Sequence, residues 1–491
     1  MTKKNSLRIL FVTPECAPWV KTGGLGDVSA ALPRALRESG IDVRVLLPGY
    51  PDVLRHVQGA PVAAELALPG FPPARLLRAR LPDDVPLWVV DCPECYERGG
   101  GPYGDEQGRD WPDNPLRFGL LSRAAALLCG AASPLDWRPA VVHCNDWQTG
   151  LVPAYLHFDP QATAASVMTL HNLAFQGIFP PEWVGRLGLP QEAFSMNGVE
   201  YYGRLSFLKA GLYYADRLTT VSPRYALEIQ SAPLGFGLEG LLAGRREALT
   251  GIVNGIDTEL WDSARDPHLA ARYDAATLDA KAGNKRVLQQ RLGLRVEPDM
   301  PLLGVVSRLT PQKGLDWVVQ VAARIMALPA QLAVLGSGDA ELEAAFGELA
   351  RRYPGQAAVR IGFAEPLAHL LEAGADIFLM PSRFEPCGLN QMYSQRYGTP
   401  PVVHATGGLS DTVSDATADP VRGTGFVFPK TTAASFFGAV GRAVRAYRDP
   451  ALWRRIQQNG MARDFGWPGP ARSYAALYGE LVRSRGGATL S

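Results

Sequence analysis

A glycine-rich segment near the start of the chain, KTGGLGDV at residues 21–28, has the composition of an anion-binding loop. Lys21 supplies a positive charge, and Gly23 and Gly24 allow a ligand to approach the backbone closely before Asp27 and an amphipathic run follow. Free N–H groups at the start of a helix favour anions. The spacing matches neither the Walker phosphate loop nor the dinucleotide fingerprint. We therefore predict an anion site here, with a simple packing turn as the alternative.

A second group of cations occurs in SRLTPQKG, at residues 307–314, directly after an apolar run. Arg308 and Lys313 would therefore lie at the carboxyl end of a strand, where open α/β sheets bind their ligands. Either residue alone is more often a solvated surface charge. Together with Lys21, however, they favour a diphosphate as the ligand.

A carboxylate and a second GGLxD turn stand out in the second half of the chain. Glu385 comes immediately before a helix that we expect to start near Cys387, so it either complements the helix dipole or takes part in chemistry. Cys387 has no conspicuous histidine partner that would support a thiol nucleophile. The segment ATGGLSDTV, at residues 405–413, repeats the GGLxD pattern of residues 23–27. We predict that both turns contact one ligand, although similar turns are also reused for packing.

Polar residues beside aromatic ones follow two apolar runs of the first half, in HCNDWQTGL and LHNLAFQG. Asp146 and His171 are candidates for hydrogen bonds to the hydroxyl groups of a sugar. Trp147 and His143 are interpreted as core residues. These strand ends are therefore predicted to contact a carbohydrate.

All of these residues lie in an alternation of apolar, β-rich runs and segments with helical spacing, which is typical of parallel sheets covered by helices. The 491 residues exceed what a single hydrophobic core usually organises. The alternation weakens in a polar stretch at 258–297 and starts again at PLLGVVSRL. We therefore predict an α/β protein with two doubly wound, Rossmann-like domains that face a central cleft.

The composition indicates a globular protein for which neither nucleic acid nor a membrane is an obvious partner. Hydrophobic residues make up 47% and charged residues 20%, and the formal net charge is only +1. No apolar run approaches the roughly 20 residues that a membrane helix requires. The six cysteines are few and lack the spacing of a disulfide framework, which is consistent with a reducing cytosol. Cys92 and Cys95 form a lone CxxC pair, which we interpret as two incidental thiols rather than a zinc or redox site.

The order and spacing of six motifs resemble the bacterial glycogen synthase and plant starch synthase family over nearly the whole chain. These motifs are KTGGLGDV, HNLAFQG, VNGID, SRLTPQKG, SRFEPCGLNQMYSQRYGT and TGGLSDTV. The resemblance implies a GT-B glycosyltransferase that moves glucose from ADP-glucose to the non-reducing end of an α-1,4-glucan with retention of configuration. It implies no metal and no cofactor, because ADP-glucose is the donor substrate. Retention through a covalent glycosyl-enzyme and retention through same-face attack both stay open.

The same resemblance implies residue roles, motif by motif. Glu385 matches the family's acidic residue beside the donor glucose, and Asp146 and His171 match positions on the sugar and acceptor side. Together with Lys313 and Arg308, they form the expected catalytic set. The expected donor-binding set consists of Lys21, Gly23, Gly24, Asp27, Asn254, Arg308, Lys313, Phe363, Cys387, Gly388, Leu389, Thr406, Gly407 and Gly408.

Two features of the donor site and the domain bounds are further expectations from the resemblance. The Gly407–Gly408 turn is expected to offer N–H groups to the diphosphate. Phe363 stands where relatives often carry tyrosine, so we expect it to stack on adenine without a hydroxyl contact. We expect an acceptor-side domain at 1–257, a nucleotide-sugar domain at 258–462, and a helix at 463–491 that returns to the first domain.

The expected partners are ADP-glucose and a glycogen or malto-oligosaccharide acceptor, and the expected location is the cytoplasm, where glycogen biosynthesis takes place. One alternative is another enzyme of the same architecture, such as a nucleotide-sugar epimerase or a phosphorylase, but no cofactor-lysine motif of a phosphorylase is evident. The other alternative is a non-catalytic glucan-binding relative, since fold alone never proves activity. Intact Lys21, Lys313 and Glu385 argue against such a binder.

Overall fold

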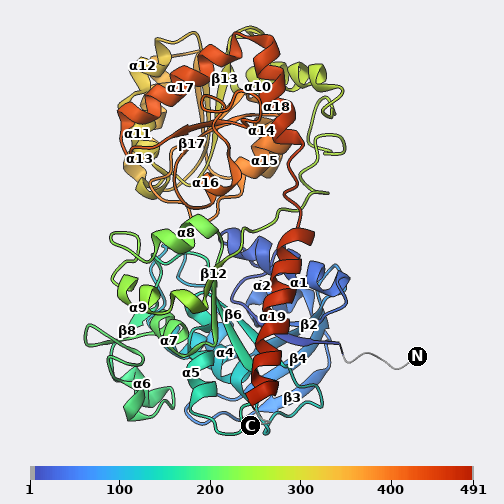
Figure 1. Ribbon diagram of the computed structural model, residues 1–491, viewed down its shortest axis with the longest axis vertical. Helices are drawn as coiled ribbons and strands as arrows, with labels where there is room; N and C mark the ends of the chain where they lie inside the picture. The colour runs from blue at the N-terminus through green and yellow to red at the C-terminus, as the bar shows by residue number, and fades with distance from the viewer. Residues whose placement is uncertain (1–5, 489–491) are drawn as a thin grey trace. The chain divides into compact units, whose positions relative to one another are not determined.

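The computed structural model describes residues 6–488, with side chains up to residue 485, and divides into two compact units. Unit 1 combines the chain up to Gly255 with the segment from Trp467 onward, and unit 2 consists of Ile256–Gly466. In Figure 1 the red C-terminal helix accordingly lies with the blue-to-green part of the chain.

Unit 1 is built on a nine-stranded sheet with the order β12-β11-β7-β6-β1-β2-β5-β4-β3. The strands from β12 to β5 pair in parallel, whereas β4 and β3 add antiparallel strands at one edge. These strands are β1 (Arg8–Val12), β2 (Asp42–Pro48), β3 (Val62–Leu66), β4 (Ala74–Arg80), β5 (Pro86–Asp91), β6 (Val141–Asn145), β7 (Ala165–Leu170), β11 (Arg217–Thr220) and β12 (Leu249–Gly251). A small antiparallel sheet contains β8 (Ile178–Phe179), β10 (Arg204–Ser206) and β9 (Glu200–Tyr201), in this order.

The helices of unit 1 mostly connect consecutive strands of the large sheet. They are α1 (Gly24–Glu38), α2 (Pro51–His56), α3 (Pro93–Tyr96), α4 (Asn114–Cys129), α5 (Leu151–His157), α6 (Trp183–Arg186), α7 (Phe207–Tyr214), α8 (Pro223–Glu228), α9 (Glu239–Gly244) and α19 (Pro468–Ala488). Short 3-10 turns occur at η1 (Trp147–Thr149), η2 (Gln191–Ala193) and η3 (Arg246–Ala248).

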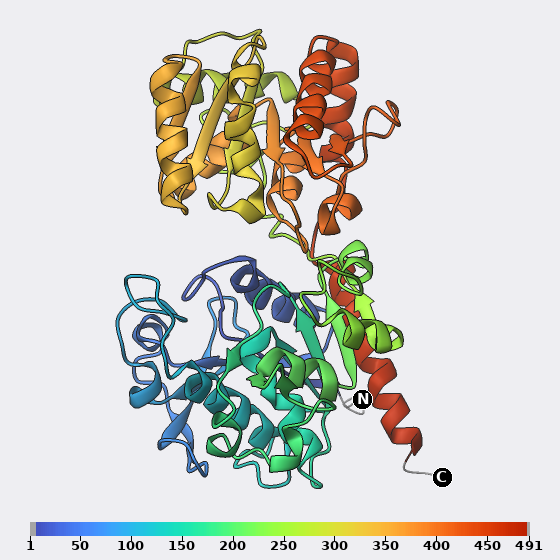
Figure 2. The ribbon, with the colours of Figure 1, turned by 90° about the vertical axis from the view of Figure 1, so that its left-hand side faces the viewer.

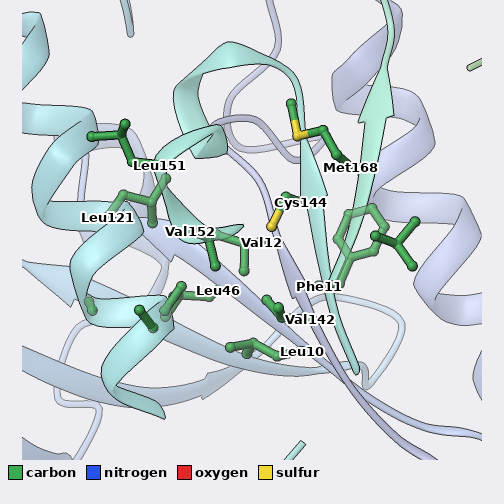
Figure 3. Close-up of a cluster of buried hydrophobic side chains, with 14 of the residues drawn as sticks. Leu10, Phe11, Val12, Leu46, Leu121, Val142, Cys144, Leu151, Val152 and Met168 are labelled. Atoms are coloured by element: carbon green, nitrogen blue, oxygen red, sulfur yellow. The ribbon is translucent and has the colours of Figure 1, made fainter. Parts of the chain in front are cut away.

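The centre of the unit 1 sheet is apolar because β6 and β7 are buried along their whole length and β1 along nearly all of it. Figure 3 shows Leu10 of β1 and Val142 of β6 in one cluster with Met168 of β7. Leu121 of α4 and Val152 of α5 cover the same cluster. Such buried parallel strands are rigid, and they fix the positions of the loops that follow them.

Helix α19 packs on unit 1 through two tyrosines. Tyr478 Oη lies 2.6 Å from His143 Nδ1, and the ring of Tyr474 lies against the same imidazole, with centroids 5.3 Å apart. The other nitrogen of His143 lies 2.5 Å from Thr169 Oγ1. Desolvation by burial lowers the pKa of His143 to about 3, so this imidazole is neutral. His143 is thus a core residue that holds α19 on the sheet.

Unit 2 is built on a six-stranded parallel sheet with the order β15-β14-β13-β16-β17-β18. Numbered along the chain from β13, this order reads 3-2-1-4-5-6, which is the order of the Rossmann fold. Figures 1 and 2 show helices on both faces of the sheet. The strands are β13 (Leu302–Val306), β14 (Gln331–Gly336), β15 (Ala357–Ile361), β16 (Ile377–Met380), β17 (Pro401–His404) and β18 (Phe426–Phe428).

The helices of unit 2 follow the strands in a regular alternation. They are α10 (Lys281–Leu292), α11 (Leu315–Gln320), α12 (Ala322–Met326), α13 (Ala340–Arg352), α14 (Glu365–Gly374), α15 (Asn390–Arg396), α16 (Gly407–Thr412), α17 (Ala433–Tyr447) and α18 (Pro450–Met461). Short 3-10 turns occur at η4 (Leu278–Ala280) and η5 (Pro311–Lys313). The prediction of two doubly wound α/β domains is confirmed by the topology of both units.

Each sheet has a point where the strand order reverses, and this point determines where a ligand binds. In unit 1, β1 pairs with β2 on one side and β6 on the other. In unit 2, β13 pairs with β14 on one side and β16 on the other. The loops after β1 and β6, and those after β13 and β16, are therefore the first places to look for a site. None of the helices within residues 6–488 has the length and apolar character needed to span a bilayer.

Candidate active site

The loop after β1 contains the glycine-rich segment, and a buried carboxylate holds it in place. Glu15 accepts hydrogen bonds from the N–H of Thr22 at 2.7 Å, the hydroxyl of Thr22 at 2.5 Å and the N–H of Gly23 at 3.3 Å. The phenol of Tyr103 donates to the same carboxylate. Only 3% of Glu15 is exposed. Sequence reasoning missed both Glu15 and Tyr103, which lie 88 residues apart.

The glycines of this loop leave the backbone open on one side. Gly23 precedes α1 in an extended conformation, and a Cβ atom added to it would meet nothing within 4 Å. Helix α1 begins at Gly24, so its first N–H groups follow directly. A Cβ atom on Gly26 would lie 3.0 Å from Lys21 Cγ, so Gly26 lets the lysine side chain lie across the loop. The Lys21 ammonium forms an ion pair with Asp27 at 2.7 Å, and about half of its side chain (49%) is exposed.

Asp146 and His171 come together at the ends of β6 and β7. The N–H of His171 donates to Asp146 Oδ1 at 2.7 Å, and His171 Nε2 lies 3.0 Å from Asn145 Oδ1. Asp146 has a φ of 56°, an uncommon conformation for a residue with a side chain. Such conformations cluster at functional sites.

The surroundings of these two side chains change their protonation. Desolvation raises the pKa of Asp146 to about 7, although the N–H groups of His171 and Asn172 oppose this shift. Desolvation also lowers the pKa of His171 to about 3, so its imidazole is neutral at physiological pH. The pair therefore offers hydrogen-bonding groups of low net charge, which suit the hydroxyls of a sugar.

In unit 2, the loops after β13 and β16 bring Lys313 and Glu385 into contact. Lys313 Nζ donates to Glu385 Oε2 at 2.6 Å, and the hydroxyl of Ser382 donates to the same oxygen at 2.9 Å. Only 5% of Glu385 is exposed, and the lysine side chain is 19% exposed. Arg308, from the same loop as Lys313, is exposed. The reversal point of this sheet thus carries two cations and one buried carboxylate.

A second ion pair fixes the two loops of unit 2 to each other. The guanidinium of Arg383 donates to both carboxylate oxygens of Asp316, each at 2.6 Å, and the backbone N–H of Arg383 donates to the carbonyl of Gln312 at 2.8 Å. The guanidinium lies 4.5 Å from the ring centroid of Trp317. Bidentate pairs of this kind are geometrically specific, so the segment that carries Lys313 is held against the one that carries Glu385.

The glycines of the second GGLxD turn pack against the chain itself. A Cβ atom on Gly407 would lie 1.9 Å from the carbonyl oxygen of Glu385, and one on Gly408 would lie 2.1 Å from that of Cys387. The N–H of Gly408 donates to the carbonyls of Glu385 and Pro386, both at 3.1 Å. The N–H of Gly408 therefore already has partners within the protein, and a contact between this turn and the diphosphate stays a prediction.

The remaining expected donor-binding residues occupy contrasting environments. Asn254, in unit 1, is buried, and its Oδ1 has no hydrogen-bond partner among the described residues. Phe363, in the loop between β15 and α14 of unit 2, is 80% exposed. Thr406 and Cys387 are buried, and Gly388 has a left-handed φ of 72° just before the helix α15, next to Leu389.

Two residues of α15 that sequence reasoning missed hold this segment in place. The side-chain amide of Asn390 donates to the carbonyl of Val306, at the end of β13, at 2.7 Å. The amide of Gln391 donates to the carbonyls of Cys387 and Gly388, both at 3.1 Å. Neither type of contact is visible in the sequence, because each depends on the packing of α15 against the sheet.

The structure brings Asp146 into contact with His171 in unit 1, and Lys313 into contact with Glu385 in unit 2. Lys21 and Lys313 belong to different units, and their action on one ligand stays a prediction. No group of three or more His, Cys, Asp or Glu side chains suited to a metal ion occurs in the part of the chain that the structure describes.

Known proteins resemble this chain over its full length. Residues 8–244 match the family described as the starch synthase catalytic domain, and residues 289–461 match the glycosyl transferases group 1. A glycogen synthase from Nitrosospira multiformis is 58% identical over 487 residues, which cover 98% of each chain. A glycogen synthase from Dechloromonas aromatica is 56% identical over 486 residues, which cover 98% of this chain and all of the relative.

Solved structures show the same similarity. The catalytic domain of starch synthase IV from Arabidopsis thaliana, bound to ADP and acarbose, superposes with a TM-score of 0.85. It is 31% identical and covers 97% of this chain and all of that one. A sucrose-phosphate synthase from Thermosynechococcus elongatus shares the fold, with a TM-score of 0.60. It is 20% identical and covers 97% of this chain and all of that one.

Proposed function

This chain belongs to the glycogen synthase family of glycosyltransferases, and from that premise we propose that it transfers glucose from ADP-glucose to the non-reducing end of an α-1,4-glucan with retention of configuration. The observation that carries the proposal is the contact between Lys313 and Glu385 at the reversal point of the unit 2 sheet. A cation and a carboxylate at this point match the two ends of a sugar diphosphate. The cation faces the phosphates, and the carboxylate faces the glucose.

We assign the stabilisation of the leaving group to cationic side chains. Cleavage of the bond between glucose and ADP places negative charge on the diphosphate, and fixed cations stabilise that charge without reorganisation. Lys313 and Arg308 supply this charge from unit 2, and Lys21 supplies it from unit 1. These cations take the role that a metal ion has in many phosphoryl-transfer sites. We therefore propose that transfer requires neither a metal nor a cofactor.

We assign a positioning role to Glu15. Its carboxylate fixes the backbone of Thr22 and Gly23, and this segment presents Lys21 and the start of α1. Because Glu15 is nearly fully buried and points into the loop, it acts through the loop rather than on the substrate. A preformed loop binds an anion without the entropic cost of ordering it.

Asp146 and His171 are assigned to the sugar side. The neutral imidazole and the carboxyl group with its raised pKa exchange hydrogen bonds with hydroxyls at little electrostatic cost. On the nucleotide side, the exposed ring of Phe363 offers an apolar face on which adenine can stack. The unpartnered Oδ1 of Asn254 offers a further hydrogen-bond acceptor to the donor substrate.

We propose ADP-glucose and a glycogen or malto-oligosaccharide acceptor as partners, and the cytoplasm as the place of action. The starch synthase IV structure, which binds ADP and acarbose, supports this choice of ligands. Among the described residues, all six cysteines are free and buried, as expected for a protein from a reducing compartment.

The decisive experiment measures ADP release from ADP-glucose with and without glycogen. We expect release that depends on the acceptor, elongation of the glucan, and a higher kcat/KM with ADP-glucose than with UDP-glucose. EDTA should leave the rate unchanged. Glycogen binding without ADP release would identify a non-catalytic binder instead, and a higher kcat/KM with UDP-glucose would overturn the assignment of the donor.

A further inference from the structure

The CxxC pair of unit 1 forms a turn at the start of the helix α3, outside the site described above. Cys92 precedes the helix, and the N–H of Cys95 donates to its carbonyl at 3.1 Å. Such a turn holds the Cα atoms of its first and fourth residues within about 7 Å of each other, close to the range that a disulfide spans. The sequence alone had favoured two incidental thiols, but the backbone brings the two residues within reach of a disulfide.

The environment makes the two thiols chemically different. The neighbouring side chain of Cys95 lowers the pKa of Cys92 and outweighs the opposing effect of burial. The side chain of Cys92 and burial raise the pKa of Cys95. One sulfur is therefore prone to ionise, and its neighbour keeps its proton. A reactive thiol beside a resolving thiol is the arrangement found in dithiols that cycle between reduced and oxidised states.

A cavity of about 370 Å³ lies beside this turn. Asp91, Pro93 and Glu97, the neighbours of the two cysteines in sequence, line one side of it, but the cysteines themselves do not. The thiols are almost fully buried, which excludes bulky disulfides such as glutathione disulfide. A small uncharged oxidant needs only a brief local opening of the turn to reach them.

We propose that Cys92 and Cys95 form a reversible dithiol–disulfide couple that hydrogen peroxide oxidises. The thiolate of Cys92 attacks one peroxide oxygen, the O–O bond breaks, and the leaving hydroxide takes a proton from solvent to become water. Cys92 is then a sulfenic acid. The sulfur of Cys95 displaces its hydroxyl group, which leaves as a second water with the proton of the Cys95 thiol, and the S–S bond forms. Two thiols thus supply the two electrons that reduce one peroxide to two waters.

A chain of hydrogen bonds connects this turn to the glycine-rich loop. Arg117, which is buried in α4, donates from Nε to the carbonyl of Cys95 at 2.8 Å and from Nη1 to the carbonyl of Pro102 at 2.9 Å. Its own carbonyl accepts from the hydroxyl of Tyr96 at 2.7 Å. The segment next to Pro102 contains Tyr103, whose phenol donates to Glu15.

Oxidation should therefore alter the donor loop. A disulfide holds two sulfur atoms about 2 Å apart, closer than two free thiols can lie, so the turn that carries the carbonyl of Cys95 has to shift. Arg117 ties that carbonyl to the segment of Tyr103, and Glu15 ties Tyr103 to the N–H groups of Thr22 and Gly23. We expect weaker binding of the donor substrate in the oxidised protein, and this part of the inference rests on the proposed function.

The test treats the intact protein with hydrogen peroxide and then with dithiothreitol. Peptide mass analysis should find the peptide with Cys92 and Cys95 two mass units lighter after peroxide and restored after dithiothreitol. The KM for ADP-glucose should rise about twofold to thirtyfold on oxidation, the range that coupling through a contact network supplies. Cys92→Ser and Cys95→Ala should abolish both changes. The matched control Cys129→Ala removes a buried thiol whose pKa is raised by desolvation, and it should respond like the unmodified protein.

The possible outcomes separate the parts of the inference. If no disulfide forms between Cys92 and Cys95, the couple does not exist. If the disulfide forms and the KM for ADP-glucose stays the same, the connection to the glycine-rich loop is refuted. An equal loss of activity in Cys92→Ser would assign the peroxide effect to another residue, such as Cys387, and would also overturn the proposal. If the untreated protein transfers no glucose, the proposed function fails, while the mass measurement still decides whether the couple exists.

Discussion

The two GGLxD turns have almost the same sequence, but their glycines are required for different reasons. In unit 2, Gly407 and Gly408 lie so close to the segment from Glu385 to Cys387 that no side chain fits. In unit 1, Gly23 faces open space, with nothing within 4 Å of the position of a Cβ atom. The glycines of the first turn therefore leave its backbone open on one side, whereas those of the second allow close packing against the segment with Glu385.

The carboxylates beside these turns differ in the same way. Glu15 of unit 1 uses its oxygens for the backbone and hydroxyl groups of its own loop. Glu385 of unit 2 uses one oxygen for Lys313 and Ser382, which are side chains at the reversal point of the sheet. One carboxylate shapes a loop, and for the other we propose a part in the chemistry. A shared motif therefore indicates where a site can lie, and the contacts of each GGLxD turn and its carboxylate indicate the role of that copy.

The largest expected effect comes from Gly408→Ala. The new Cβ atom would lie 2.1 Å from the carbonyl oxygen of Cys387, so the backbone has to move apart. We expect the free energy of unfolding of unit 2 to fall by about 3 kcal/mol or more, together with nearly complete loss of activity. Chemical denaturation followed by circular dichroism measures the stability, and ADP release measures the activity.

The matched substitution in unit 1 is Gly23→Ala. Its extended backbone and open surroundings accept a methyl group, so the free energy of unfolding should change by less than about 1 kcal/mol. The methyl group would instead reduce the space for a ligand and raise the KM for the donor. A large loss of stability in Gly23→Ala, or a stable and active Gly408→Ala, would remove the distinction between the two turns.

The second largest effect is expected for Glu385→Gln, which preserves the shape of the side chain and removes its charge. We expect kcat to fall about 10²- to 10³-fold, as when one group that stabilises a transition state is lost. The affinity for ADP, measured by calorimetry, should change little, because ADP lacks the glucose that the carboxylate faces. Equal losses in ADP affinity and kcat would instead indicate that Glu385 only complements the helix behind it.

The corresponding change in unit 1, Glu15→Gln, should act on binding rather than on turnover. The amide oxygen can still accept from the N–H groups of Thr22 and Gly23, but the amide nitrogen cannot accept from the hydroxyls of Thr22 and Tyr103, so the loop loses part of its support. A hydrogen bond to a charged group contributes about 1.5–3 kcal/mol, and we expect the KM for ADP-glucose to rise about tenfold. A fall in kcat alone would show that Glu15 takes part in the chemistry.

Much of the fold and of the candidate site could be predicted from the sequence, because it depends on short-range patterns. The alternation of apolar and helical segments is local, and so is the position of Lys313 or Glu385 at the end of a strand. The contact between Lys313 and Glu385 follows from the pairing of β13 with β16, which places the two loops side by side.

The residues that sequence reasoning missed depend on contacts between distant segments. Glu15 meets Tyr103 across 88 residues, and His143 meets Tyr478 across 335. Neither contact can be predicted from the spacing of residues in the sequence. The close packing of Gly408 against Cys387 was also not predicted, since it depends on the segment that lies against the turn.

The smallest expected effect is an interaction between the cations of the two units. If Lys21 and Lys313 hold one diphosphate, removal of either lysine also weakens the contribution of the other. The second substitution should then reduce transition-state stabilisation by less than the first. A double-mutant cycle with Lys21→Ala and Lys313→Ala, read from kcat/KM, should give an interaction term of about 0.5–3 kcal/mol. The control cycle pairs Lys21→Ala with Lys430→Ala, an exposed lysine of unit 2, and should be additive. Additive losses in the first cycle as well would mean that the lysines serve separate sites, and the open turn of unit 1 would then bind something other than the donor of unit 2.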